Sequence, residues 1–494
     1  MKNLLYIISL CGLLTACDLQ EEPYGFYSDD NFYKSETDAE SGLLYAYNAL
    51  TFLEYSRGIF YIGDIPTETM SPKSDEAGDV YQLENWIANR ETEQLQYYFK
   101  YCYIAINRAN TVIDHIQNSS VLSETARRRI LGEAYFLRAW NYFNLVRTFG
   151  IVPVQTKMVA ELSQTTPPMA TGLDQLYDLI LGDLTRADNL LEVNKVFGRA
   201  DKVAAQSLMA KAYLTIASSK EHNVHRYTEM RREPRIMYDS AAYWAGKVVR
   251  DYKNVYDFDT NLRDIYDVDK PTGPEHIFIM PIDRSGTQEG NYSKLPLLFL
   301  PSNNSVPFYI RYGNGDLQRA NGNGWGVFLC NDEFVETQFS TTDKRRTELI
   351  HRDIYDASGN PIVPNQVKGY FSSKYVDPDF IGERTSARPY LIRFSDIALV
   401  YAEAAGPEAG LAYVNRIRER AGVTPLPSGM TTDKFREAVI KERALELAFE
   451  GNRLYDLRRT ASVTTTDIKA AGLSEAEAAY YPIPQRDIDL NPNL

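Results

Sequence analysis

Three glutamates on one predicted helix are the first candidates for chemistry. In "IKERALELAFEGNRLYDLRRT", residues 440 to 460, Glu442, Glu446 and Glu450 recur every four residues and so line one stripe of the helix. Glycoside hydrolysis uses two carboxyl groups roughly 5–10 Å apart across an open cleft, and carboxylates one helical turn apart fall near that distance. The stripe could therefore serve as an acid–base pair or as part of a buried ion-pair network.

The cationic residues around the stripe favour the structural alternative. Like charges at i, i+4 repel each other, so a packed stripe needs opposing cations. Arg416 and Arg420, also four apart, lie on the preceding predicted helix, with Arg443 and Arg453 nearby. We therefore interpret the stripe as a structural ion-pair network in which these arginines face the glutamates.

Other catalytic patterns are weak. Of the five histidines only His222 and His225 are close in sequence, in the polar segment "KEHNVHRY", which contains no HExxH motif and no cysteine. This context favours a solvated pair of histidines over a zinc site. Asp316, Asp332 and Glu333 form no recognisable set. The sequence thus predicts no catalytic group, metal site or cofactor.

The first cysteines indicate export. Leu4 to Leu14 is an eleven-residue apolar run after Lys2, roughly 16 Å long as a helix and so too short to span a bilayer. "LTAC", ending at Cys17, has the form of a bacterial lipobox. We expect a signal peptide over residues 1–16 and a lipid on Cys17; an ordinary signal peptide is the alternative. Cys102 and Cys330 are predicted to be buried free thiols rather than a disulfide.

Charge and aromatic content limit the classes of binding partner. The formal net charge of −13 argues against nucleic acid and anionic lipid head groups. The chain has 35 tyrosines and only 4 tryptophans, and tyrosine-rich surfaces suit sugar or protein contacts. Composition does not choose between these two kinds of partner.

Periodicity predicts a mainly α fold. Amphipathic helices are expected at about 37–53, 92–116, 124–149, 173–191, 202–217, 238–249, 394–405, 410–421 and 432–450, with Ser123 and Gly150 as caps of the third. Ala134, Leu137, Ala139, Tyr142 and Leu145 recur 71 residues later as Ala205, Leu208, Ala210, Tyr213 and Ile216. That spacing is near two tetratricopeptide repeats, although chance helical periodicity is the alternative.

The predicted architecture is a single domain over residues 17–494. A tetratricopeptide-like helix-pair scaffold occupies about 37–250 and 394–460. A loop-rich insertion with short strands occupies about 251–393, where Gly, Pro and Asn are frequent.

Five sequence blocks together resemble a known family. They are GEAYFLRAWNYFNLVRTFG, RADKVAAQSLMAKAYL, PYLIRFSDIALVYAEAA, IKERALELAFEGNRLYDLRRT and YYPIPQRDIDLNPNL, running from residue 132 to the C-terminus. In this order they are similar to the blocks of the SusD-like (RagB/SusD) outer-membrane lipoproteins, many of which continue a few residues further.

The resemblance implies a location and a function. The protein would be lipid-anchored in the outer membrane of a Gram-negative bacterium, facing the exterior. Four tetratricopeptide-like helix pairs would pack on a TonB-dependent, SusC-like transporter. The opposite, loop-rich face would bind a glycan and deliver it to the pore, without catalysis.

Sugar rings stack on Trp or Tyr while amides, carboxylates and Arg bind hydroxyl groups, and this mixture selects two stretches. The first contains Asp79, Tyr81, Asn85 and Trp86, in which Trp86 is either a glycan platform or a packed loop anchor. The second lies in the insertion and contains Tyr292, Asn303, Asn304, Tyr309, Arg311, Tyr312 and Trp325. Trp140 and Trp244 are expected in the core.

Two other classes of function stay open. A protein-interaction scaffold would show no sugar affinity, and a glycoside hydrolase would need paired carboxylates among the insertion loops. The glycan itself is not identified by the sequence; Arg311 and Arg319 leave an acidic sugar possible.

Overall fold

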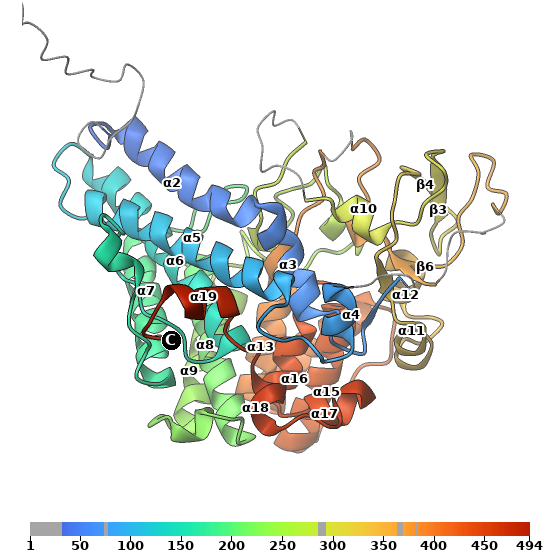
Figure 1. Cartoon of the computed structure of the whole chain (residues 1–494). Coiled ribbons are helices and arrows are strands. Elements are labelled where there is room, and N and C mark those ends of the chain that lie inside the picture. The colour runs from blue at the N-terminus through green and yellow to red at the C-terminus, as the bar shows by residue number, and fades with distance from the viewer. Residues whose placement is uncertain (1–31, 74–77, 285–292, 363–368, 381–383) are drawn as a thin grey trace, which may run out of the picture.

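The computed structural model describes residues 32–73, 78–284, 293–362, 369–380 and 384–494. Long helices form the scaffold, each packed against the next along the chain (Figure 1). Their bounds are α2 Glu36–Thr51, α3 Leu53–Gly63, α5 Glu93–Ile116, α6 Glu124–Phe149, α7 Leu173–Leu190, α8 Lys202–Glu221 and α9 Pro234–Asp251. The mainly α, helix-pair architecture predicted from periodicity is confirmed.

The predicted caps of α6 are also present. The Ser123 hydroxyl accepts a hydrogen bond from the Ala126 amide, and Gly150 follows the helix with a φ of 76°. A left-handed residue at this position closes the helix C-terminus, which favours glycine. The small residues of the repeat, such as Ala134 and Ala205, are fully buried where neighbouring helices approach.

The scaffold resumes after the insertion. Its later helices are α13 Phe394–Ala405, α14 Pro407–Arg420, α15 Thr432–Glu446, α16 Arg453–Arg459, α17 Val463–Thr466, α18 Glu475–Ala479 and α19 Gln485–Leu490. Helix α13 packs against α9, which joins the two parts of the scaffold into one core. Helix α15 ends four residues before the predicted boundary, where the chain turns into α16.

The insertion contains short strands, as predicted, together with short helices that were not predicted. Its elements are β2 His276–Ile279, α10 Leu295–Phe299, β3 Phe308–Arg311, β4 Leu317–Ala320, β5 Phe328–Cys330, α11 Asp332–Gln338, α12 Lys344–Leu349, β6 Ile350–His351, β7 Phe371–Ser372, η4 Ser373–Tyr375 and β8 Tyr390–Arg393. These strands form two-stranded antiparallel sheets: β2 pairs with β8, β3 with β4 and β6 with β7. Figure 1 shows β3, β4 and β6 at one side of the molecule, away from α7 and α9.

One strand links the N-terminal region to the insertion. Strand β1, Met70–Pro72, pairs with β5, and helix α4, Asp79–Glu84, follows it. This pairing joins the segment before α4 to the segment that directly follows the Trp325 loop, although the two are far apart in sequence.

Candidate functional site

The glutamate stripe is fully buried and paired with cations. Arg418 and Arg345 donate to Glu442 at 2.5 and 2.6 Å. Arg420 and Arg393 donate to Glu446 at 2.7 and 3.3 Å. Glu450 accepts from Arg393 at 2.8 Å and from Lys374 at 2.7 Å. These contacts confirm the interpretation of the stripe as an ion-pair network.

The predicted cation partners were largely wrong. Of the four arginines proposed, only Arg420 contacts the stripe; Arg416 pairs with Asp257 at 3.0 Å. Arg443 binds Asp396 and Asp456, and Arg453 binds Glu68. The reason is that Arg345, Lys374 and Arg393 come from the insertion, where no local spacing points to them.

Neighbouring cations keep Glu446 and Glu450 ionised. Burial alone would raise the pKa of Glu446, but Arg420, Arg393 and Arg345 outweigh it and lower the pKa to about 2. Arg393 and Lys374 likewise hold the pKa of Glu450 below its usual value despite burial. A general acid needs a raised pKa and access to substrate, and these buried, ionised carboxylates have neither.

The first candidate stretch forms helix α4 and the loop after it. Asp79 is half-buried and accepts a hydrogen bond from the Gln94 amide at 2.9 Å, and burial raises its pKa. Tyr81 is 52% exposed. The Asn85 side chain donates to the Tyr81 carbonyl at 2.8 Å. Only Tyr81 in this group therefore presents most of its side chain to solvent.

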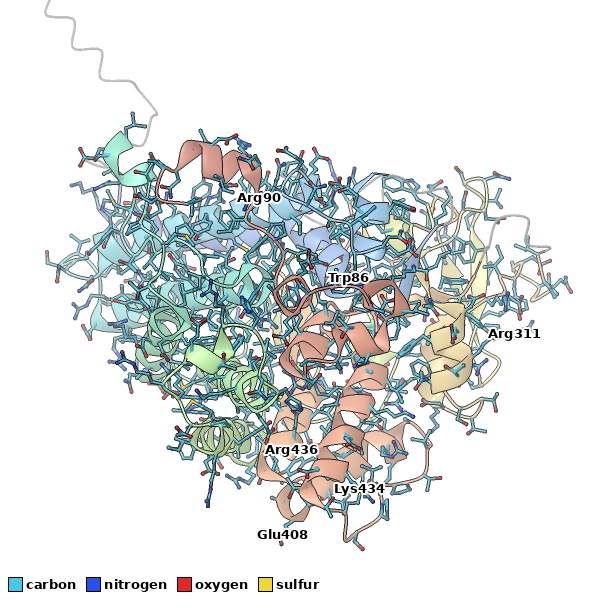
Figure 2. The ribbon with its side chains drawn as sticks, turned by 60° about the horizontal axis from the view of Figure 1, so that its bottom comes forward. Trp86, Arg90, Arg311, Glu408, Lys434 and Arg436 are labelled. Carbon is cyan, nitrogen blue, oxygen red and sulfur yellow. The ribbon has the colours of Figure 1, made fainter. Side chains whose placement is uncertain are left out.

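Trp86 is placed as a loop anchor. It is only 8% exposed, its Nε1 donates to Asp467 at 3.3 Å, and its ring stacks on Tyr481 with a centroid separation of 6.1 Å. Figure 2 shows it where the blue N-terminal ribbon meets the red C-terminal one. This placement contradicts the expectation of an open platform and agrees with the packed-anchor alternative, because both partners come from the C-terminal segment.

Two insertion loops form one surface around Trp325. The amides of Asn303 and Ser305 donate to the Gly322 carbonyl at 2.9 and 3.2 Å, which joins the loop after α10 to the loop before β5. A Cβ on Gly322 would lie 2.0 Å from the Val306 carbonyl oxygen, so glycine is needed for this approach. Asn303 and Asn304 are consequently held beside the Trp325 loop.

Trp325 itself is partly exposed. Its amide donates to the Leu297 carbonyl in α10 at 2.6 Å, and its side chain is 46% exposed. The Lys294 ammonium lies 5.5 Å from the ring centroid. The backbone is thus fixed while the ring remains accessible, which is the arrangement expected of a stacking platform.

The β3–β4 hairpin carries the remaining candidates on two faces. Tyr309 pairs with Arg319 across the strands, and Arg311 lies 4.1 Å above the Tyr355 ring; these side chains face outward. Arg311 projects at the edge of the molecule in Figure 2. Tyr312, by contrast, is 5% exposed. Its placement contradicts the expectation of an open contact residue, because it belongs to the inward face with Phe308 and Ile310.

The structure brings together a polar group that the sequence analysis did not recognise as a unit. Behind the hairpin a polar cavity of about 640 Å³ is lined by Arg263, Asp264, Asp267, Asp316 and Arg319, among others. Arg263 lies 4.5 Å from the Tyr312 ring centroid and pairs with Asp316 at 3.2 Å. No sequence signal identified this cavity, because its walls come from four separate stretches, at 261–269, 312–319, 349 and 373–378.

Two candidates lie outside the described residues: the lipidation site Cys17 and the insertion residue Tyr292. Cys102 and Cys330 are free and buried, as predicted. His222 contacts the Ser218 carbonyl at 2.8 Å, and His225 lies edge-on to Tyr480. Trp140 is buried in the core and Trp244 packs partly against it, as predicted.

The described residues contain neither a metal-binding cluster nor a membrane-spanning helix. In residues 32–73, 78–284, 293–362, 369–380 and 384–494, no group of three or more His, Cys, Asp or Glu side chains is arranged to hold a metal ion. Over the same part of the chain, no helix combines the length and the apolar character needed to cross a membrane.

Family models match both halves of the scaffold. Residues 33–214 match a model described as "Starch-binding associating with outer membrane", and residues 341–494 match the SusD family. SusD-like protein P2 from Formosa agariphila is 24% identical over 92% of this chain and 89% of its own length.

Solved structures share the fold. A SusD homologue from Bacteroides thetaiotaomicron has a TM-score of 0.76 at 20% identity, covering 95% of this chain and 98% of that one. A laminarin-binding SusD-like protein has a TM-score of 0.73 at 22% identity, covering 93% and 98%.

Proposed function

We propose that this chain, which belongs to the SusD-like family, is a surface lipoprotein that captures an oligosaccharide or polysaccharide and delivers it to a SusC-like, TonB-dependent transporter. The observation that carries glycan capture is the partly exposed Trp325 ring beside Asn303 and Asn304, on loops joined by backbone hydrogen bonds. An aromatic ring can stack on the apolar face of a sugar, and amide groups can bind its hydroxyl groups.

A larger binding face extends from this centre. Tyr81 on α4 is exposed, and β1 connects the segment before α4 to β5, directly after the Trp325 loop. On the hairpin, Tyr309, Arg311 and Arg319 offer a second set of contacts. Asp79, Trp86 and Tyr312 support these loops from within, and Tyr292 stays a candidate contact. Relatives with starch- and laminarin-binding descriptions support a glycan as the ligand class.

Affinity electrophoresis tests glycan capture directly. The chain lacking residues 1–17 would be run through gels containing host or plant polysaccharides, with Trp325→Ala beside Tyr243→Ala. Tyr243 is a matched control, because it is an exposed aromatic residue (55%) on scaffold helix α9. We expect one glycan to retard the unaltered chain and Tyr243→Ala, and not Trp325→Ala.

The same gels separate the alternatives. Equal retardation of all three proteins would show that Trp325 does not contribute to glycan binding. No retardation by any glycan would favour the alternative, a tetratricopeptide-type interaction scaffold without sugar binding. Release of reducing ends from a retarded glycan would contradict a non-catalytic role.

The lipid anchor and the transporter are separate parts of the proposal. A largely apolar groove of about 910 Å³ is lined by Tyr33, Tyr45, Phe99, Tyr103 and Leu490, and also by Lys100 and Arg108. Tyr33 lies next to the start of the described chain, and fourteen extended residues would reach Cys17, at most roughly 50 Å away. An anchor on Cys17 would therefore hold this groove near the membrane, where it suits contact with the transporter.

Outer-membrane pull-downs test both parts. Cys17→Ser should release the protein from the membrane, while Tyr45→Asp should keep it anchored and reduce transporter recovery. Tyr243→Asp, the same change on α9, is the control. Equal recovery with Tyr45→Asp and Tyr243→Asp would contradict a role for the groove.

A further inference from the structure

Within the described residues, two arginines that line the same small cavity, Arg147 and Arg458, have no carboxylate partner. Arg458 on α16 is 5% exposed and donates to the carbonyl oxygens of Arg147, Thr148 and Ala478. Its remaining terminal nitrogen, Nη2, is buried and bonded to nothing. Arg147 on α6 is half-buried and donates to Phe143 O and Asn144 Oδ1. Across the described part of the chain, neither guanidinium forms a salt bridge.

The neighbouring ion pairs do not neutralise these charges. Lys211, Arg443 and Arg459 bind three carboxylates, those of Asp396, Asp456 and Glu403. That group contains three cations and three anions, so it is balanced by itself. Arg147 and Arg458 are an excess of two positive charges beside it.

Aromatic rings only partly compensate. The Arg147 guanidinium lies 3.9 Å from the Tyr455 ring centroid, and that of Arg458 lies 4.5 Å from Tyr481. Cation–π contacts of this kind stabilise a cation by about 1–2 kcal/mol and leave its net charge in place. A buried charge without a counter-charge is costly, and burial lowers the pKa of Arg458 for this reason.

A small cavity lies between the two arginines. It measures about 20 Å³ and is lined by Arg147, Arg458 and Arg459 together with the hydroxyl-bearing residues Thr215, Ser219, Tyr227, Tyr455 and Tyr480. A space of roughly 10–15 Å³ already accommodates one water-sized particle. The cavity is therefore large enough for a monatomic ion and too small for sulfate, phosphate or a carboxylate ligand.

We propose that this cavity binds a halide ion, chloride under ordinary conditions, held by Arg458 and Arg147. The Thr215 and Tyr480 hydroxyl groups already donate to the Lys211 and His225 carbonyl oxygens, so the hydroxyl groups of Tyr227 and Tyr455, each paired with another hydroxyl that can act as the donor, complete the shell. Water could fill the same space but would leave the two charges uncompensated. The ion would join three parts of the fold: α6, α8 and the segment from α16 to α18, in which α8 contacts both α6 and α16. Its expected effect is to hold the C-terminal segment against the scaffold.

Bromide diffraction is the primary test, because it uses the unaltered protein. Crystals would be grown in sodium bromide and the anomalous signal measured at the bromine edge. The thermal midpoint would be compared in potassium chloride and potassium gluconate at equal ionic strength, because gluconate cannot enter the cavity. We expect an anomalous peak between Arg147 and Arg458 and a midpoint higher in chloride by on the order of 1–2 °C.

A variant pair assigns the effect to the site. Arg458→Gln should lose the difference between the two salts, whereas Arg127→Gln should keep it, because Arg127 lies on the surface of α6 and pairs with Glu124. If Arg458→Gln does not fold, the diffraction result on the unaltered chain decides. A cavity without anomalous signal, or a peak accompanied by equal midpoints in both salts, would overturn the proposal.

Discussion

Replacing Glu446 by Gln should strongly destabilise the protein. Glu446 is 2% exposed and faces Arg420, Arg393 and Arg345 at 2.7, 3.3 and 3.6 Å. Removing its charge leaves these buried cations short of one counter-charge, which costs about 3–5 kcal/mol in comparable buried pairs. The lowering of the Glu446 pKa from 4.5 to about 2 corresponds to roughly 3 kcal/mol, at about 1.4 kcal/mol per unit. Both routes give a loss of about 3 kcal/mol.

Urea unfolding followed by circular dichroism measures that loss. Glu437→Gln is the matched control, because Glu437 lies on the same helix, α15, and is exposed. We expect the control to stay within about 0.5 kcal/mol of the unaltered protein. Equal free energies of unfolding for Glu446→Gln and Glu437→Gln would refute the conclusion that the stripe is tightly paired.

The pH dependence gives a second measure of the same pairing. Because the folded pKa of Glu446 lies below its unfolded value, its contribution is complete above about pH 5 and is lost as the pH falls toward 2. The difference between the unaltered protein and Glu446→Gln should therefore shrink over that range. A difference independent of pH would show that the loss comes from packing and not from charge.

Three further outcomes follow from buried groups. Cys102 and Cys330 should react with a thiol reagent only after unfolding, because burial raises the pKa of both thiols; rapid labelling of the native protein would contradict this. Burial lowers the pKa of His276 and His351 to about 4, so stability should fall between pH 6.5 and 4 as the unfolded chain binds protons, by roughly 2 kcal/mol per histidine at pH 5 in urea titrations. Trp86→Ala should lower the thermal midpoint more than Trp86→Phe does, and equal midpoints would argue against a ring-packing role.

The sequence predicted most of the long scaffold helices because their signals are local, but it did not predict α3, Leu53–Gly63. Ser123 and Gly150 mark the two ends of α6 by residue type alone. The spacing of apolar residues shows which side of each scaffold helix packs into the core. The end of α15 was missed because Leu447 to Glu450 continue the helical pattern while the chain already turns; Phe449 has a φ of 65°. Local periodicity cannot report a turn that tertiary packing imposes.

The candidate site was only partly predictable for a related reason. Glycines on both sides of Trp325 indicated an exposed ring, and the ring is exposed. Trp86 has equally suitable neighbours in sequence, yet it is buried by Asp467 and Tyr481, which lie nearly four hundred residues away. Exposure of an aromatic residue depends on such distant partners, and residue type in a loop does not reveal them.

The ion-pair network has a consequence for the binding face. The insertion supplies Arg345, Lys374 and Arg393 to the scaffold glutamates, so it is fixed to α15 and the turn after it by buried charge. Next to Lys374, the Tyr375 ring centroid lies 4.4 Å from that of Phe299 in α10. The Leu297 carbonyl of the same helix accepts a hydrogen bond from the Trp325 amide.

A continuous set of contacts therefore runs from Glu450 through Lys374, Tyr375 and Phe299 to the Trp325 loop. Because the charged end of this set is buried and the Trp325 ring is exposed, loop residues around the ring can change with little effect on the paired core. Sugar specificity and fold stability are thus assigned to different residues of the same insertion. Removing the Glu446 charge should lower the free energy of unfolding. Replacing Trp325 should lower glycan affinity while leaving the free energy of unfolding nearly unchanged.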